Sequence, residues 1–278
     1  MKVSFKTRPQ HAEWGPMVDF WREADRIELY STGWTFDHFY PIFSDENGPC
    51  FEGWTMLAYM AGVTERIRLG VLVTGNTHRH PAVLANMAAT LDVASGGRLD
   101  IGLGAGWAEN EHAAYGINLP PLRERFDRLE EACAVIDTLL TNEWSNFQGN
   151  HYQLTNARSE PKPIQQPRPP ILIGGKGEKR TLRIVAEWAD EWNFPGGPPS
   201  ELNHLIGVLH QHCADIGRDP TDIGVSVKAE ATIEPDAFAE LVAAYREAGA
   251  EHIIAHFPAP HDPADLGRYA DALAPVVA

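Results

Sequence analysis

Short apolar runs of strand length alternate along the chain with longer segments in which apolar residues recur at helical spacing. This alternation is typical of βαβ units around a parallel sheet. Eight strand and helix pairs can be counted, the number that closes a (β/α)8 or TIM barrel. We therefore predict an α/β protein with one barrel domain over residues 1–278. The expected strands are Lys2–Lys6, Gly33–His38, Ile67–Thr74, Leu99–Leu103, Ile171–Ile173, Glu191–Phe194, Gly224–Lys228 and His252–His256.

Two of the intervening segments have clear helical patterns. The segment Pro81–Ala94 begins with a proline suited to a first helical turn, and Gly96-Gly97 follows its last apolar position. The segment Leu122–Leu140 has one apolar stripe and oppositely charged residues four positions apart, such as Arg123 and Asp127. We expect this second helix to pack on the outside of the barrel.

The pattern breaks between residues 141 and 170, where polar residues and prolines replace the regular spacing. We expect an excursion inserted between two barrel strands. A surface linker is one interpretation of this excursion. A lid or a pocket wall is the other, because long irregular segments in compact domains often carry function.

The composition narrows the classes of partner. The 23 Lys and Arg residues against 38 Asp and Glu residues give a net charge of -15, which repels nucleic acid and anionic membranes. No apolar run approaches the roughly 20 residues of a membrane span. The widely spaced Cys50, Cys133 and Cys213 argue against a disulfide framework or a zinc–thiolate site. We expect a cytoplasmic protein that acts on a small molecule.

The first candidate chemistry follows the second expected strand, where Asp37 and His38 stand between aromatic residues. Active sites of (β/α)8 barrels lie at the C-terminal ends of the strands. Histidine side chains exchange protons near neutral pH, so His38 is a candidate catalytic residue with Asp37 beside it. A structural histidine next to a loop-capping aspartate is the alternative, and the position favours the catalytic interpretation.

The ends of the third and fourth strands are small and polar. Thr74 and its neighbours leave room for a flat ring, whereas a metal site at His78 and His80 lacks acidic ligands at a suitable spacing, so we expect no metal. His80 is expected to cap the following helix. The alternate glycines of 102–106 allow close approach of a backbone or a ligand, but they lack the spacing of a dinucleotide fingerprint. Further polar candidates are Asn110, Glu111 and His112.

A glycine-rich, basic turn follows the fifth expected strand. Glycines before a helix expose backbone N–H groups to which a phosphate can bind, and the helix dipole favours an anion there. An ordinary solvated turn is the alternative, and we favour a phosphate-binding turn. The residues concerned are Gly174, Gly175, Lys176, Gly177, Lys179 and Arg180.

Several short motifs occur in one order and spacing between Thr32 and Asn193. They are Phe36-Asp37-His38, Val73-Thr74-Gly75-Asn76, Arg79-His80-Pro81-Ala82, Ser95-Gly96-Gly97-Arg98-Leu99, Gly102-Leu103-Gly104-Ala105-Gly106-Trp107, Glu124-Arg125-Phe126 and Pro170-Ile171-Leu172-Ile173-Gly174-Gly175. Together they resemble the luciferase-like monooxygenase superfamily. Within it, the chain looks closest to the branch that uses coenzyme F420, an 8-hydroxy-5-deazaflavin, rather than FMN.

The resemblance implies a ring bound in the barrel mouth with its phosphate at the turn 174–180. It further implies main-chain contacts to the ring near Val73 and Thr74, where the family often has a cis peptide bond without proline. Ala105, Gly106 and Asn110 are implied as additional contacts. Relatives are often dimers, so we also expect a homodimer.

One departure limits what the resemblance implies about the substrate. The deazaflavin-dependent sugar-phosphate dehydrogenases of this family carry a tryptophan and an acid where this chain has Ile42 and Trp107. The proton-handling set of those enzymes is therefore incomplete here, and their activity is not transferred.

Our hypothesis is hydride transfer between F420 and a small organic substrate, with His38 handling the proton and Asp37 orienting its imidazole. We expect four aromatic residues to wall a mainly apolar pocket: Trp34, Phe36, Trp107 and Trp192. Core packing is the alternative for all four, above all for Trp192. The rival functions are an FMN-dependent monooxygenase that uses oxygen and a partner reductase, a non-catalytic flavin-binding protein and, last, a metal-dependent hydrolase.

Overall fold

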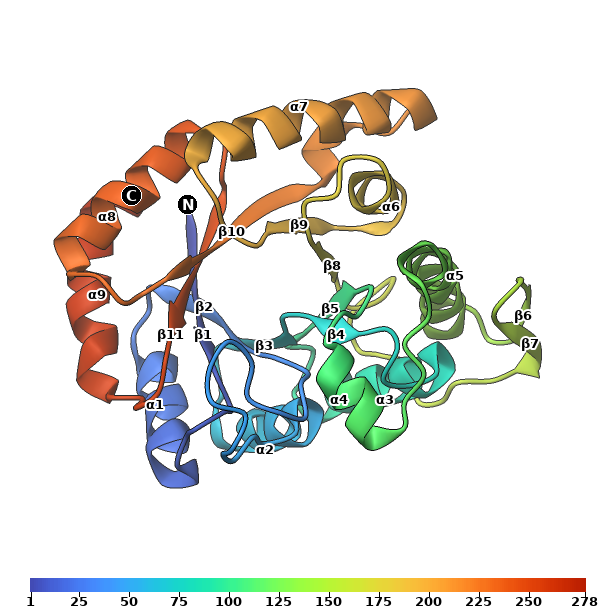
Figure 1. Ribbon diagram of the computed structural model, residues 1–278, viewed down its shortest axis with the longest axis horizontal. Helices are drawn as coiled ribbons and strands as arrows, with labels where there is room; N and C mark the ends of the chain where they lie inside the picture. The colour runs from blue at the N-terminus through green and yellow to red at the C-terminus, as the bar shows by residue number, and fades with distance from the viewer.

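The computed structural model describes all residues from 1 to 278, and its centre is a closed barrel of eight parallel strands (Figure 1). Each strand pairs with the next in the order given below, and β11 pairs back with β1. The predicted (β/α)8 fold is confirmed. The barrel strands are β1 (Lys2–Thr7), β2 (Tyr30–Thr35), β3 (Arg68–Val71), β5 (Leu99–Gly104), β8 (Ile171–Gly174), β9 (Glu191–Phe194), β10 (Gly224–Glu230) and β11 (His252–Phe257).

The helices lie around the outside of the barrel (Figure 1). The helix predicted over Pro81–Ala94 has these bounds, and His80 accepts a hydrogen bond from the Ala82 N–H as expected of a cap. None of the helices combines the length and the apolar character that crossing a membrane requires. They are α1 (Trp14–Arg26), α2 (Gly53–Val63), α3 (Pro81–Ala94), α4 (Glu109–Tyr115), α5 (Leu122–Thr141), α6 (Thr181–Trp188), α7 (Pro199–Ile216), α8 (Pro235–Glu247) and α9 (Pro263–Val277), with a 3-10 turn at Pro220–Asp222.

The apolar core has two parts. The larger part is a cluster of 65 buried residues that joins the strands to the surrounding helices. The smaller part has four buried residues from different sides of the barrel, and their mutual contact places them in its interior. These four are Trp34, Leu72, Leu172 and Ile254.

Two strand predictions need correction. The second strand spans Tyr30–Thr35 rather than Gly33–His38, because β3 ends at Val71, opposite Thr35, and leaves later residues without a partner. The third expected strand is interrupted by a cis peptide bond between Leu72 and Val73, and the chain resumes pairing as β4 (Thr74–Gly75). The cis bond itself agrees with the expectation from the family.

The interruption of the third strand is accommodated by two glycines on the neighbouring strand β5. A Cβ atom at Gly102 would lie 1.9 Å from the carbonyl oxygen of Val71, and one at Gly104 would lie 2.6 Å from Val73 Cγ2. The alternate glycines therefore make room for the neighbouring strand, which is one of the two uses expected of them.

The excursion between α5 and β8 contains a β-hairpin of β6 (Ser145–Gln148) and β7 (Gln153–Ala157). Glu131 of α5 accepts hydrogen bonds from the backbone N–H groups of residues 150–152, which fastens the hairpin turn to that helix. The hairpin lies beyond α5, away from the barrel centre (Figure 1).

We predict that Gly102→Ala lowers the free energy of unfolding by at least about 2 kcal/mol, because the added methyl group would overlap a backbone oxygen that cannot turn away. Gly62→Ala is the matched control, since Gly62 is an exposed residue of α2 with no atom in the way. That control should gain roughly 0.5 kcal/mol. Urea denaturation measures both changes, and a Gly102→Ala protein as stable as the wild type would contradict this account of the strand interruption.

Candidate active site

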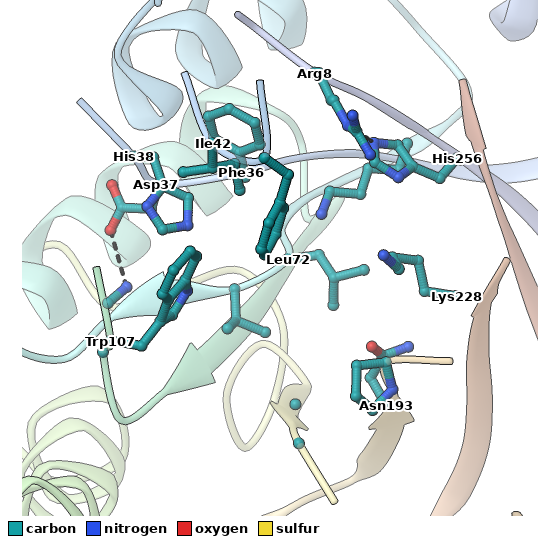
Figure 2. A pocket seen from close by; sticks show the side chains of 18 of the residues that line it. Arg8, Phe36, Asp37, His38, Ile42, Leu72, Trp107, Asn193, Lys228 and His256 are labelled. Carbon is teal, nitrogen blue, oxygen red and sulfur yellow. Dashed lines mark hydrogen bonds between the residues drawn. The ribbon is translucent and has the colours of Figure 1, made fainter. Parts of the chain in front are cut away.

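A cavity of about 570 Å³ opens at the C-terminal end of the barrel. All eight barrel strands, or the loops directly after them, contribute to its lining, as expected for a (β/α)8 barrel. Figure 2 shows many of these side chains converging on the cavity. The lining residues are Lys6, Arg8, Phe36, Asp37, His38, Ile42, Phe43, Leu72, Val73, Gly75, His78, Gly106, Trp107, Glu111, Gly174, Gly175, Asn193, Pro195, Lys228, Glu230 and His256.

Asp37 lies in the loop after β2, and its carboxylate is fully buried. Arg79 donates to both carboxylate oxygens, at 2.7 and 2.8 Å, and the backbone N–H of Gly75 donates at 3.1 Å. Burial works to raise the pKa of Asp37, but the hydrogen bonds from Arg79 and His78 outweigh it and hold this pKa below its usual value. Asp37 therefore holds the turn after β4 rather than the imidazole of His38, which corrects our expectation.

His38 is oriented by Glu111 of α4. Its Nδ1 lies 2.7 Å from Glu111 Oε1, and Glu111 Oε2 accepts from the backbone N–H of Phe39 at 2.7 Å. The Glu111 side chain is 1% exposed, and despite burial its hydrogen bonds to His38 and His78 keep its pKa well below the usual range. An ionised carboxylate can only accept hydrogen bonds, so Nδ1 of His38 carries the N–H and donates it to Glu111, and Nε2 forms no hydrogen bond with the protein.

His78 lies between the two buried carboxylates. Its Nδ1 is 3.3 Å from Asp37 and its Nε2 is 3.5 Å from Glu111. Burial alone would lower the pKa of His78, but these two hydrogen-bonded carboxylates raise it to about 9. His78 is therefore a cation at neutral pH, and it neutralises a site that would otherwise have excess negative charge.

The nitrogen and oxygen atoms of His78, Glu111 and His112 come within 4.8 Å of one another, a spacing that could suit a metal ion. Both ring nitrogens of His112 are already engaged, however, by the Ala108 carbonyl at 2.5 Å and by Thr77 Oγ1 at 2.7 Å. We therefore assign these side chains to the hydrogen-bond network.

The opposite wall is formed by polar and charged side chains of β10, β11 and the end of β1, none of which was predicted from the sequence (Figure 2). Glu230 accepts hydrogen bonds from Arg8 at 3.2 Å, Lys228 at 3.0 Å and His256 Nδ1 at 3.0 Å. Burial lowers the pKa of His256 to about 3, so this histidine is neutral. Its Nε2 accepts a hydrogen bond from Arg8 Nε at 3.0 Å.

Only some of the residues that we expect to contact a flavin ring line the cavity. Val73 and Gly106 line the cavity, and Arg125 donates to the Gly106 carbonyl at 2.7 Å. The expected Thr74, by contrast, is buried and accepts a hydrogen bond from the Trp54 indole at 3.2 Å, and Ala105 lies outside the cavity lining.

Asn110 does not face the cavity. It is exposed on α4 and donates to Glu46 at 2.9 Å. Successive residues of a helix point about 100° apart, so when Glu111 faces the cavity its neighbour Asn110 does not.

In the basic turn before α6, Gly174 and Gly175 line the cavity, whereas Gly177 is exposed and lies outside its lining. Two of the three expected cations already have acidic partners. Lys176 pairs with Glu201 at 2.9 Å, and Arg180 pairs with Asp127 at 2.7 Å and Glu130 at 3.5 Å. Lys179 is exposed.

The aromatic wall is smaller than expected. Phe36 and Trp107 line the cavity, and Trp107 stacks on Phe43 at 5.3 Å. Trp34 and Trp192 are instead buried in the core. No residue of the excursion 141–170 lines the cavity, so the interpretation of this excursion as a pocket wall is wrong. The hairpin of the excursion packs on α5 instead.

The chain is similar to known proteins over nearly its whole length. A family model described as luciferase-like monooxygenase matches residues 1–276. An F420-dependent glucose-6-phosphate dehydrogenase of Kineococcus radiotolerans is 30% identical over 277 residues, covering 98% of this chain and 80% of the relative. Pyrimidine monooxygenase RutA of Allorhizobium ampelinum is 35% identical over 170 residues, covering 58% of this chain and 45% of the relative.

Among solved structures, an F420-dependent secondary alcohol dehydrogenase in complex with an F420-acetone adduct matches with a TM-score of 0.87. The match covers 100% of this chain and 99% of that protein at 18% sequence identity. At this identity the likeness establishes the shared fold.

We predict that the stabilisation from His78 depends on pH. Because folding raises the pKa of His78 from 6.5 to about 9, its contribution is complete below about pH 6.5 and is lost as the pH rises through about 9. The stability difference between wild type and His78→Gln should therefore shrink by on the order of 2 kcal/mol over this range.

Urea denaturation at several pH values measures this difference, and exposed His204 provides the control variant His204→Gln. The comparison of wild type with His78→Gln is needed because a second group also makes the stability depend on pH. Burial lowers the pKa of Lys6 to about 7, so Lys6 changes the stability in the opposite direction over the same pH range. A wild-type advantage over His78→Gln that stays constant with pH would contradict the ionic role of His78.

Proposed function

The chain belongs to the luciferase-like monooxygenase family, and on this basis we propose that it is a coenzyme F420-dependent oxidoreductase that transfers a hydride between the deazaflavin and a small organic substrate. The family predicted from the motifs is thereby confirmed. The observation that carries the proposed function is His38 at the cavity, with Nδ1 held by Glu111 and Nε2 free of protein partners. The similarity to the F420-dependent relative over 98% of the chain supports the choice of cofactor.

Two features of the cavity support the binding of a flat ring, namely its volume and the glycines in its lining. Its volume lies within the range of cofactor and ligand pockets. Glycines occur where side chains would fill the space near Val73 and Thr77: a Cβ atom at Gly106 would lie 2.4 Å from Thr77 Oγ1, and one at Gly174 would lie 3.0 Å from Val73 Cγ1. We propose that the main chain at Val73, Gly106 and Gly174–Gly175 holds the ring.

We place the phosphate at the turn 175–179, where backbone N–H groups and Lys179 would bind it. Lys176 and Arg180 contribute less, because Glu201, Asp127 and Glu130 already engage them. When bound, the deazaflavin supplies or accepts the hydride.

His38 supplies the proton chemistry of the proposed reaction. Glu111 fixes the ring orientation and the Nδ1–H tautomer, so Nε2 is the atom that donates a proton to a substrate oxygen or accepts one from it. Asp37, which we first expected to orient His38, takes a positioning role through Arg79 and Gly75. Phe36 and Trp107 pack their ring edges against the imidazole and limit access of water to it.

An FMN-dependent monooxygenase that uses oxygen and a partner reductase is the second candidate. The similarity to pyrimidine monooxygenase RutA favours it, although that match covers 58% of this chain. A homodimer and a reductase that recycles the cofactor complete the proposed assembly.

We predict that His38→Ala and Glu111→Gln separate cofactor binding from turnover. Turnover should fall by roughly 10²- to 10⁴-fold in His38→Ala, because a positioned proton donor contributes that much. Glu111→Gln should fall less, since the amide can still contact the imidazole. F420 affinity should change little in either variant.

Loss of F420 fluorescence on reduction measures the rate, with secondary alcohols and glucose 6-phosphate as first substrates because similar proteins are named for them. His210→Ala, at an exposed histidine of α7, is the control. An unchanged rate in His38→Ala would contradict the proposed role of this histidine.

We also predict that Lys179→Ala weakens F420 binding by about threefold to tenfold, because it removes an exposed cation from the phosphate turn. Arg180→Ala should have a smaller effect, since its guanidinium faces Asp127 and Glu130. Lys2→Ala, at an exposed lysine at the start of β1, is the control. Calorimetric titration with F420 distinguishes the three, and equal affinities would place the phosphate elsewhere.

A further inference from the structure

The wall of the cavity opposite His38 carries more positive than negative charge. The cationic side chains Lys6, Arg8 and Lys228 line it together with one carboxylate, that of Glu230. The neighbouring His256 is neutral and adds no charge. In a chain with a net charge of -15, this excess of cations inside a cavity calls for a specific explanation.

Glu230 cannot neutralise all three cations. Arg8 and Lys228 already donate to its two oxygens at 3.2 and 3.0 Å, and His256 donates to the same carboxylate at 3.0 Å. Neutral His256 also accepts from Arg8 Nε at 3.0 Å, which fixes the guanidinium on this wall.

Of the three cations, Lys6 is the one that does not donate a hydrogen bond to Glu230. It lies on β1, is 7% exposed, and its Nζ stands 5.9 Å from the centre of the Phe36 ring. No acceptor of the protein is hydrogen-bonded to this amine, although it lines the cavity. A buried ammonium group without an acceptor is unfavourable unless a ligand supplies one.

We propose that Lys6, Arg8 and Lys228 form a subsite for the anionic end of the substrate, a carboxylate or a phosphate. This assignment rests on the proposed function in one respect, that the occupant is the substrate of the F420-dependent reaction. The subsite and His38 then hold the substrate from opposite sides of the cavity (Figure 2), which would place its reacting carbon between them.

Binding of an anion in the subsite would be coupled to protonation of the Lys6 amine. Burial and the positive charges of Lys228 and Arg8 lower the pKa of Lys6 to about 7. The negative charge of Glu230 raises this pKa, but by less than the other causes lower it. An anion next to the amine favours its charged form. Binding above pH 7 should therefore take up a proton, and affinity should fall as the pH rises.

The test is calorimetric titration of the cofactor-free protein with sulfate, an oxyanion whose own charge does not change near neutral pH. We expect binding that is about tenfold weaker in Lys6→Met, since one charge-assisted contact is lost. Lys6→Arg should retain most of the affinity. Lys2→Met, at an exposed lysine at the other end of β1, should match the wild type. Thermal unfolding verifies that each variant is folded.

The pH dependence gives a second readout. Wild-type affinity for sulfate should fall by about tenfold between about pH 6 and pH 9, and the affinity of Lys6→Met should stay constant. Absence of sulfate binding to the wild type, or equal affinities of wild type and Lys6→Met, would overturn the proposal.

A third arm distinguishes the sources of the anion. Sulfate that still binds in the presence of saturating F420 supports a substrate subsite, whereas displacement of sulfate by F420 would assign the wall to the acidic part of the cofactor and overturn our assignment. The first titration needs no cofactor, so failure of F420 to bind would refute the proposed function and leave the sulfate result standing.

Discussion

Two carboxylates are buried at the mouth of the barrel, and the arrangement of the site depends on pairing them. Asp37 and Glu111 have side chains that are 0% and 1% exposed. An unpaired buried charge would be strongly destabilising, so each carboxylate needs partners in the folded barrel. Arg79 donates hydrogen bonds to Asp37, His38 donates one to Glu111, and His78 contacts both carboxylates. The loop after β2, the turn before α3 and helix α4 are thereby tied together.

This pairing has a functional consequence. Glu111 directs the N–H of His38 toward itself and leaves the second ring nitrogen for the cavity. Across the cavity, the wall of Lys6, Arg8 and Lys228 keeps uncompensated positive charge. In our proposal the cavity is therefore polarised, with the proton-transferring histidine on one side and the anion subsite on the other. A negatively charged small molecule would bind in one direction in such a space.

The architecture could be predicted from the sequence because it depends on local patterns. Strand β9 and helix α3 have the predicted bounds, since Glu191–Phe194 alternates polar and aromatic residues and Pro81–Ala94 carries its own start signal. The place of the glycine-rich turn before α6 and the position of His38 at the mouth also follow from counting strands. The end of β2 was misplaced because it depends on where β3 ends, which only the paired structure shows.

The partners of the site residues could not be predicted in the same way. Asp37 is the neighbour of His38 in sequence, but successive side chains of an extended chain point to opposite sides. The true partner, Glu111, is 73 residues away. Similarly, Lys6 and Lys228 resembled ordinary strand-end charges, because the barrel register decides which of them face inward.

The proposed function requires that this barrel mouth bind F420 in preference to FMN. Titration of the purified, cofactor-free protein with each compound, followed by fluorescence or calorimetry, distinguishes the two cofactors. We expect saturable F420 binding with at least about tenfold preference over FMN. Preferential binding of FMN would contradict it and would favour an oxygen-dependent monooxygenase.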